Sequence, residues 1–153
     1  MSIELTIILA QRRRERRVSK KSLFGMEKII QKDYTYRLLQ CAYNVHSALG
    51  PGLLESVYEK ALVYELQLQG FEVKHQVDVK IKYRDIVFDA DLRLDAIVDD
   101  NVILELKSVS EVLPVHKKQL LTYMRLTGIK LGYVINFNEE YLKDGIERIV
   151  NNL

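Results

Sequence analysis

Cysteine and proline are scarce in this chain. Cys41 stands alone among 153 residues, so no disulfide can form within the chain, and the partner cysteines of a structural zinc site are missing. We therefore expect a reducing, cytoplasmic setting. With 2 Pro and 7 Gly, the composition excludes collagen-like, low-complexity and wholly disordered chains.

Long apolar runs are also missing. The run near the start, at about residues 5–10, is far too short to span a bilayer, and it precedes the arginines, which is the wrong order for a signal peptide. Hydrophobic residues make up 48% and charged residues 29%. The sequence thus predicts one soluble globular domain without a membrane partner.

Charge is distributed unevenly along the chain. Residues 11–32 hold nine basic and two acidic side chains, a net +7, whereas residues 33–153 hold 14 basic and 18 acidic ones, a net −4. The basic segment could hold a polyanion such as nucleic acid, or it could be a solvated tail that is not translated if synthesis begins at Met26. We divide the chain into a basic extension, residues 1–32, and a domain, residues 33–153.

Two amphipathic helices are expected at the start of the domain. Each has apolar residues three or four positions apart, and each ends at a glycine, Gly50 followed by Pro51 and then Gly70. The two apolar stripes are Leu38, Ala42, Val45 and Leu49, and Leu54, Val57, Ala61, Tyr64 and Leu68.

The period then changes from 3.6 to 2, which is typical of strands with one buried face. A turn at Arg84-Asp85 makes a hairpin, and the loop 99–101, with Asn101 in the left-handed region, leads into a third strand. The remaining expected elements are a helix over 114–127, a strand over 131–137 and a closing helix over about 141–150. The order ααβββαβα indicates an α/β (α+β) sandwich whose sheet is a mostly antiparallel meander with one crossover strand.

The third strand carries a charged pair. Glu105 and Lys107 are two residues apart and share a face, and pairing that is symmetric about Asp100 places Asp95 opposite Glu105. Like charges at directly opposed positions are destabilising. A divalent cation would remove this cost, because Mg²⁺ binds one or two carboxylates and keeps several waters. Lys107 could then orient a water or stabilise charge on a phosphate oxygen.

An alternative is a solvated salt bridge on a surface hairpin, which contributes little. The apolar neighbours in residues 102–106 argue for a strand that is buried on both sides, where charges need partners.

Asp95 followed by Glu105-Leu106-Lys107 resembles the D…(D/E)-x-K core of the PD-(D/E)XK nuclease superfamily. The segment 52–58, Gly-Leu-Leu-Glu-Ser-Val-Tyr, matches the signature of the bacterial GxxExxY protein family. The likeness extends from about Asp33 to the C-terminus. One departure is Leu94, which stands where the superfamily has proline before the aspartate.

This resemblance implies a restriction-endonuclease-like core, a mixed sheet flanked by helices. It implies nuclease activity with Mg²⁺ or Mn²⁺, and we expect the nucleic acid to be DNA rather than RNA. By the same resemblance Asp95 and Glu105 bind the metal, Glu55 supplements them, and Lys107 is the catalytic lysine. Gln119 and Tyr123 resemble the Q-x-x-x-Y pair that borders the active site, and residues four apart do project from one face of a helix.

Simpler roles stand beside these. Glu55 could act as a first-turn acid that interacts with the helix dipole and its free amides. We expect Tyr58 to be a core aromatic with a wet hydroxyl, His46 to cap its helix, His75 to pack in the core and His116 to be exposed. A non-catalytic module that keeps the nuclease fold and binds nucleic acid or a protein is the alternative function, and hydrolysis of a small phosphorylated molecule is a third. An oligomer is compatible with the sequence.

Overall fold

The computed structural model describes residues 25, 27 and 31–151. The chain divides into two compact units, residues 1–39 and 40–153, and most of the basic extension lies outside the described residues. In the first unit, residues 31–39 are helical, and the Thr35 hydroxyl donates a 3.0 Å hydrogen bond to the carbonyl of Gln31. The second unit contains every residue proposed for chemistry, and its first helical segment is residues 40–49.

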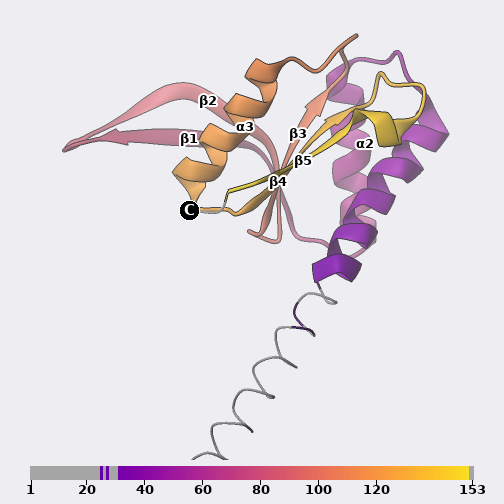
Figure 1. Cartoon of the computed structure of the whole chain (residues 1–153), viewed down its shortest axis with the longest axis horizontal. Coiled ribbons are helices and arrows are strands. Elements are labelled where there is room, and N and C mark those ends of the chain that lie inside the picture. Colours follow the sequence, from indigo (N-terminus) through magenta and orange to yellow (C-terminus); the bar gives the residue numbers. More distant parts are fainter. Residues whose placement is uncertain (1–24, 26, 28–30, 152–153) are drawn as a thin grey trace, which may run out of the picture. The chain divides into compact units, whose positions relative to one another are not determined.

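The second unit is a mixed five-stranded sheet in the order β1-β2-β3-β4-β5, with helices on its two faces (Figure 1). Strands β1 to β3 form the expected antiparallel meander, and β4 is parallel to β3 after the crossover helix α3. The elements are α2 (Glu55–Leu68), β1 (Val73–Tyr83), β2 (Ile86–Val98), β3 (Val102–Lys107), α3 (Pro114–Thr127), β4 (Leu131–Asn136), the 3₁₀ turn η1 (Leu142–Gly145) and β5 (Ile146–Val150).

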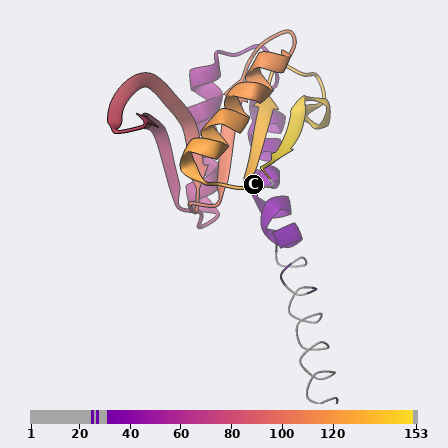
Figure 2. The same ribbon diagram turned by 60° about the vertical axis from the view of Figure 1, so that its left-hand side comes forward.

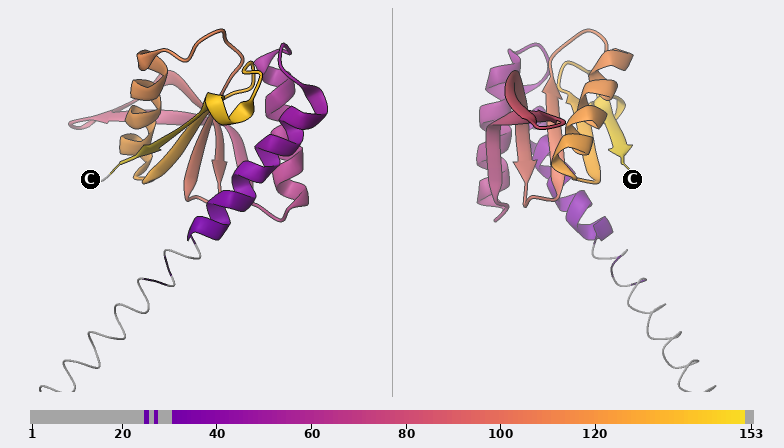
Figure 3. Two further views of the ribbon diagram at one scale, coloured as in Figure 1. Left: turned by 45° about the vertical axis from the view of Figure 1, so that its right-hand side comes forward. Right: turned by 90° about the vertical axis from the view of Figure 1, so that its left-hand side faces the viewer.

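Helices α2 and α3 lie against opposite faces of the sheet (Figure 3). On the α3 face, buried Leu120, Tyr123 and Met124 pack with Ile103 of β3 and Val134 of β4. Helix α3 has the bounds that the sequence predicts, because Pro114 fits a first turn and Gly128 ends the helix at a φ of 76°. Among the described residues, no helix is both long and apolar enough to cross a membrane.

The predicted buried face of α2 is wrong. The buried side chains are Tyr58, Leu62 and Leu66, whereas the side chains of Leu54, Tyr64 and Leu68 are more than half exposed. Both sets recur every three or four residues, so periodicity alone cannot choose between them. Contact with the sheet makes the choice, since the ring of Tyr58 stacks on Phe137 at 4.6 Å between centroids.

The closing helix over 141–150 is also a wrong prediction. The chain forms the short turn η1 and then β5, which pairs antiparallel with β4 along Leu131–Ile135. The apolar positions Ile146, Ile149 and Val150 have helical spacing, but an open edge of β4 would leave backbone groups unpaired, and strand pairing satisfies them.

The β1–β2 hairpin turns at Arg84-Asp85 as expected, and it projects beyond the rest of the sheet (Figure 2). Its alternation does not bury one face throughout, because Ile86 and Phe88 near the tip are exposed. In the β2–β3 turn, the residues in the left-handed region are Asp99 and Asp100, and not Asn101. Aspartate accepts this backbone conformation as well, so the turn keeps its length and the strand register is unaffected.

Candidate active site

The β2–β3 register brings two acidic residues together. The pairs Val98↔Val102, Ile97↔Ile103 and Ala96↔Leu104 are those that the sequence predicts, and one further step places Asp95 opposite Glu105. The backbone pairing of β2 with β3 itself ends at Ala96↔Leu104. The backbone N–H of Leu106 donates instead to Oδ2 of Asp95 at 2.7 Å, so this carboxylate is held at the end of the hairpin pairing.

Glu105 is a buried acid on the central strand of the sheet, and its charge is only partly compensated. It is 4% exposed, and its Oε1 atom has no hydrogen-bond partner among the described residues. Its Oε2 atom lies 3.9 Å from Nζ of Lys107. Burial and the charge of Asp95 raise the pKa of Glu105 to about 8, against a smaller opposing effect of Lys107. The ammonium group therefore offsets only part of the cost of burying this carboxylate.

The carboxylate of Asp95 is also only partly compensated. Burial raises its pKa, and the Leu106 N–H and the charge of Lys107 oppose that rise. The side chain of Glu105 is also a hydrogen-bonding partner of Asp95. Two acids this close favour either a shared proton or a shared cation.

Glu55 approaches this pair from α2. It lies in the first turn of the helix, and its carboxylate is hydrogen-bonded to the backbone of Ser108, just beyond β3. Burial raises the pKa of Glu55, Lys107 lowers it, and Asp95 and Glu59 raise it further. Glu55 is thus tied to the end of β3 as well as placed at a helix N-terminus.

Gln119 and Tyr123 border the acids from α3. The amide of Gln119 donates a 2.8 Å hydrogen bond to the Tyr123 hydroxyl. Burial raises the pKa of Tyr123, and Glu105 and Asp95 raise it further, whereas the bond from Gln119 lowers it. All six residues that the sequence singles out therefore lie around one end of β3.

The hydroxyl of Tyr58 holds the loop before α2. It donates to the carbonyl of Gly50 at 2.5 Å and accepts from the backbone N–H of Leu53 at 3.1 Å. The prediction that Tyr58 is a core aromatic is confirmed. Its hydroxyl, which we expected to contact water, forms hydrogen bonds with the backbone instead. Ser108 adds a 2.6 Å bond to the Leu53 carbonyl, so the loop that starts α2 is fastened to the end of β3.

Asn136 is a buried residue whose role the sequence analysis missed. Its side chain accepts from the Val109 N–H at 3.1 Å and donates to the Val109 carbonyl at 2.9 Å. It thereby fixes the loop that follows Lys107. In the sequence, an asparagine directly after the apolar strand 131–135 could have indicated this role.

Two of the histidine predictions are wrong. His46 bonds the carbonyl of Glu139 at 2.8 Å and does not cap its own helix. His75 is exposed, and its Nδ1 lies 3.9 Å from Oε1 of Glu59. His116 is partly exposed, and its Nδ1 accepts the N–H of Leu113 at the start of α3. The rings of His46 and His75 make contacts between elements, which a single-strand or single-helix pattern does not contain.

Among the described residues, no group of three or more His, Cys, Asp or Glu side chains is arranged to hold a metal ion. The donors present are nevertheless suitable for a hard cation. Asp95 and Glu105 supply carboxylate oxygens, and Glu105 Oε1 is buried with no hydrogen-bond partner in the described part of the chain. Two carboxylates with waters are sufficient for Mg²⁺, so the residues fit such an ion without a third protein ligand.

Comparison with known proteins gives a family and a fold. No curated protein matches this chain. The crystal structure of SSO0001 is similar with a TM-score of 0.50 and 21% identity, over 64% of this chain. The chain spans 50% of the length of that protein, and the likeness shows the fold alone. Residues 32–149 match the PD-(D/E)XK nuclease superfamily, so the match covers β1 to β4, β5 up to its last residue and all six candidate residues. The chain therefore belongs to the PD-(D/E)XK nuclease superfamily.

Proposed function

We propose that this protein is a divalent-metal-dependent nuclease that hydrolyses phosphodiester bonds of nucleic acid. The observation that carries the proposal is the buried Glu105 carboxylate, which has an unpartnered oxygen beside Asp95 and an ammonium group 3.9 Å away. A buried charge that its partners compensate only in part is costly. Such a cost at a site common to a nuclease superfamily is understandable if a cation binds there.

In this proposal Asp95 and Glu105 hold Mg²⁺ or Mn²⁺, and Glu55 supplements them from α2. When bound, the ion supplies a water of lowered pKa and stabilises the leaving oxygen. Lys107 lies beside Glu105 and provides a positive charge for the developing oxyanion. The hydrogen-bonded pair Gln119 and Tyr123 orients the phosphate or a water from the α3 side.

The motif in residues 52–58 supports a finer assignment to the bacterial GxxExxY family. Its glutamate is Glu55, and its tyrosine is Tyr58, which fastens the loop before α2. The tyrosine of the motif thus has a structural role, because it fixes the loop that precedes α2 and with it the position of Glu55. We assign DNA as the preferred nucleic acid and the cytoplasm as the location.

A non-catalytic nucleic-acid or protein-binding module is the second candidate. The net charge of −4 over residues 33–153 favours it, since a groove for duplex DNA is normally positive. Such a module would keep the nuclease fold but would not hydrolyse nucleic acid.

The test uses the full chain in calorimetric Mn²⁺ titrations and in cleavage assays on DNA and RNA with Mg²⁺ or Mn²⁺. Asp95→Asn should abolish metal binding, and Lys107→Ala should lower kcat by roughly 10²–10³ fold, the effect of removing one such electrostatic group. Lys117→Ala is the matched control, because Lys117 forms a half-exposed pair with Glu147 at 2.8 Å. Unchanged cleavage by Lys107→Ala would reject the mechanism. Nucleic-acid binding that persists in EDTA, with no turnover under either metal, would select the binding module.

A further inference from the structure

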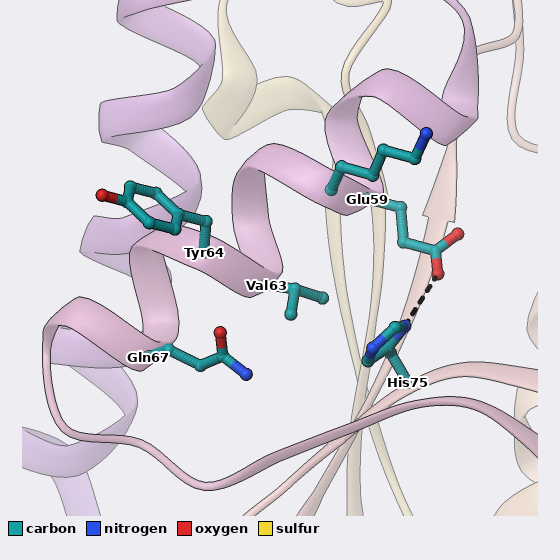
Figure 4. A pocket seen from close by; sticks show the side chains of 6 residues that line it. Glu59, Val63, Tyr64, Gln67 and His75 are labelled. Carbon is teal, nitrogen blue, oxygen red and sulfur yellow. Dashed lines mark ion pairs between the residues drawn. The ribbon is translucent and has the colours of Figure 1, made fainter.

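A pocket of about 180 Å³ opens between α2 and β1 (Figure 4). Its walls are the α2 side chains Glu59, Lys60, Val63, Tyr64 and Gln67, and His75 of β1. Figure 4 shows Glu59 and His75 directed toward each other across it. The proposed chemistry uses none of these six residues.

The pocket adjoins the acidic site. Glu59 is one helical turn from Glu55, and residues four apart are neighbours on a helix. His75 pairs with Ala96 in the sheet, directly after Asp95. The Gln76 amide donates a 2.7 Å hydrogen bond to Oε1 of Glu59, which fastens this wall of the pocket to β1. An occupant would therefore lie beside the end of the sheet where Asp95 and Glu55 meet.

The size and chemistry of the pocket suit a planar heterocycle. It is smaller than the roughly 300–1,000 Å³ of pockets for drug-sized ligands. Val63 and Tyr64 offer an apolar and an aromatic surface, and Tyr64 is 64% exposed, so its ring is accessible for stacking. Gln67 and His75 supply hydrogen-bonding groups of both kinds, and Lys60 adds a positive charge at the wall.

Charge indicates how a nucleic acid would gain affinity here. Residues 33–153 carry a net −4, so phosphate contacts made by this domain alone give weak binding. Stacking and hydrogen bonding to bases do not depend on net charge, and single-stranded bases are free to make such contacts. A base inside a duplex would first have to be unstacked and flipped out, which is energetically unfavourable.

We infer that this pocket binds an unpaired base next to the phosphodiester at the acidic site, and that the substrate is single-stranded nucleic acid or a frayed end. The inference rests on the proposed nuclease function, because it assigns the substrate class of the same site. Glu59 joins the two parts, since it lines the pocket and lies one turn from Glu55.

The test compares a single-stranded oligonucleotide, its duplex and bis(4-nitrophenyl) phosphate, a diester without a base. Val63→Phe fills the pocket, and Gln67→Ala removes a hydrogen-bonding group. We expect each to lower the ratio of kcat/KM for the oligonucleotide to kcat/KM for the base-free diester by about tenfold, typical of one lost base contact. Leu68→Ala, an exposed change on the same helix outside the pocket, should keep the wild-type ratio.

Binding of the labelled single strand in EDTA, followed by fluorescence anisotropy, gives a readout that needs no turnover. Val63→Phe should weaken it about tenfold. Wild-type affinity and ratio in both pocket variants, or a preference for duplex, would overturn the inference while leaving the nuclease proposal intact. A protein that binds the strand through the pocket but hydrolyses neither diester would overturn the nuclease proposal instead.

Discussion

The backbone N–H of Leu106 donates a 2.7 Å hydrogen bond to the carboxylate of Asp95 on the neighbouring strand. A side-chain oxygen thus takes the place of a backbone acceptor where the β2–β3 ladder ends. The bond stabilises the charged form of Asp95 and keeps it beside Glu105, whose own charge is less well compensated. The acidic site is therefore part of the way the hairpin pairing terminates.

Glu105→Gln should stabilise the metal-free protein at pH 8 and above. The substitution keeps the shape of the side chain but removes a buried charge that Asp95 repels. Because one pK unit corresponds to about 1.4 kcal/mol, we expect an increase of a few kcal/mol in the free energy of unfolding. Urea unfolding in EDTA measures it. The same variant should lose Mn²⁺ binding in calorimetry. A decrease in the free energy of unfolding, together with the loss of binding, would indicate a purely structural role for Glu105.

The stability of the metal-free protein should fall as pH rises from about 5 to 8. The pKa of Glu105 is raised from its ordinary 4.5 to about 8 on folding, so the folded state binds more protons than the unfolded state in this window, and unfolding becomes easier with rising pH. The raised pKa of Asp95 acts in the same direction. Thermal unfolding across this range in EDTA should give a slope that Glu105→Gln reduces. Saturating Mn²⁺ should oppose the slope, because the metal binds the deprotonated acids.

Tyr58→Phe should destabilise the domain by roughly 1–3 kcal/mol. The change leaves the stacked ring in place but deprives the Gly50 carbonyl and the Leu53 N–H of the hydroxyl, and two part-buried groups that lose their partner carry a cost of this order. Denaturant unfolding measures the change. Tyr141→Phe is the control, since Tyr141 is 61% exposed. Equal effects of the two variants would contradict the structural role of the Tyr58 hydroxyl.

Asn136→Ala should destabilise the protein by about 1–3 kcal/mol for each backbone group of Val109 that is left unpaired. The side chain is fully buried and bonds both the N–H and the carbonyl of that residue. Asn44→Ala removes an exposed amide that bonds Gln40 and Glu65 and should cost less than 1 kcal/mol. Chemical unfolding of the two variants side by side tests the difference, and comparable losses would count against the role of Asn136.

Local pattern was enough to determine much of the β2–β3 strand pair that carries Asp95 and Glu105. The loop 99–101 sets the register of β2 and β3, and alternation along each strand then places Asp95 opposite Glu105 and Lys107 on the same face. Helix α3 was equally predictable, since Pro114 and Gly128 mark its ends within the sequence. These features depend on residues close together in the chain, whose geometry is restricted by hydrogen bonding and by backbone sterics.

Contacts between distant segments decided the rest. Two apolar stripes compete on α2, and packing of Tyr58 on Phe137 selects the buried one. The segment after Gly145 has helical spacing but completes the sheet, because β4 offers unpaired backbone groups there. The closeness of Glu55 to Lys107 and the pocket between α2 and β1 arise in the same way. The pattern of the sequence identifies Asp95, Glu105 and Glu55. The burial that raises the pKa values of these acids exists only when the helices and the sheet pack together.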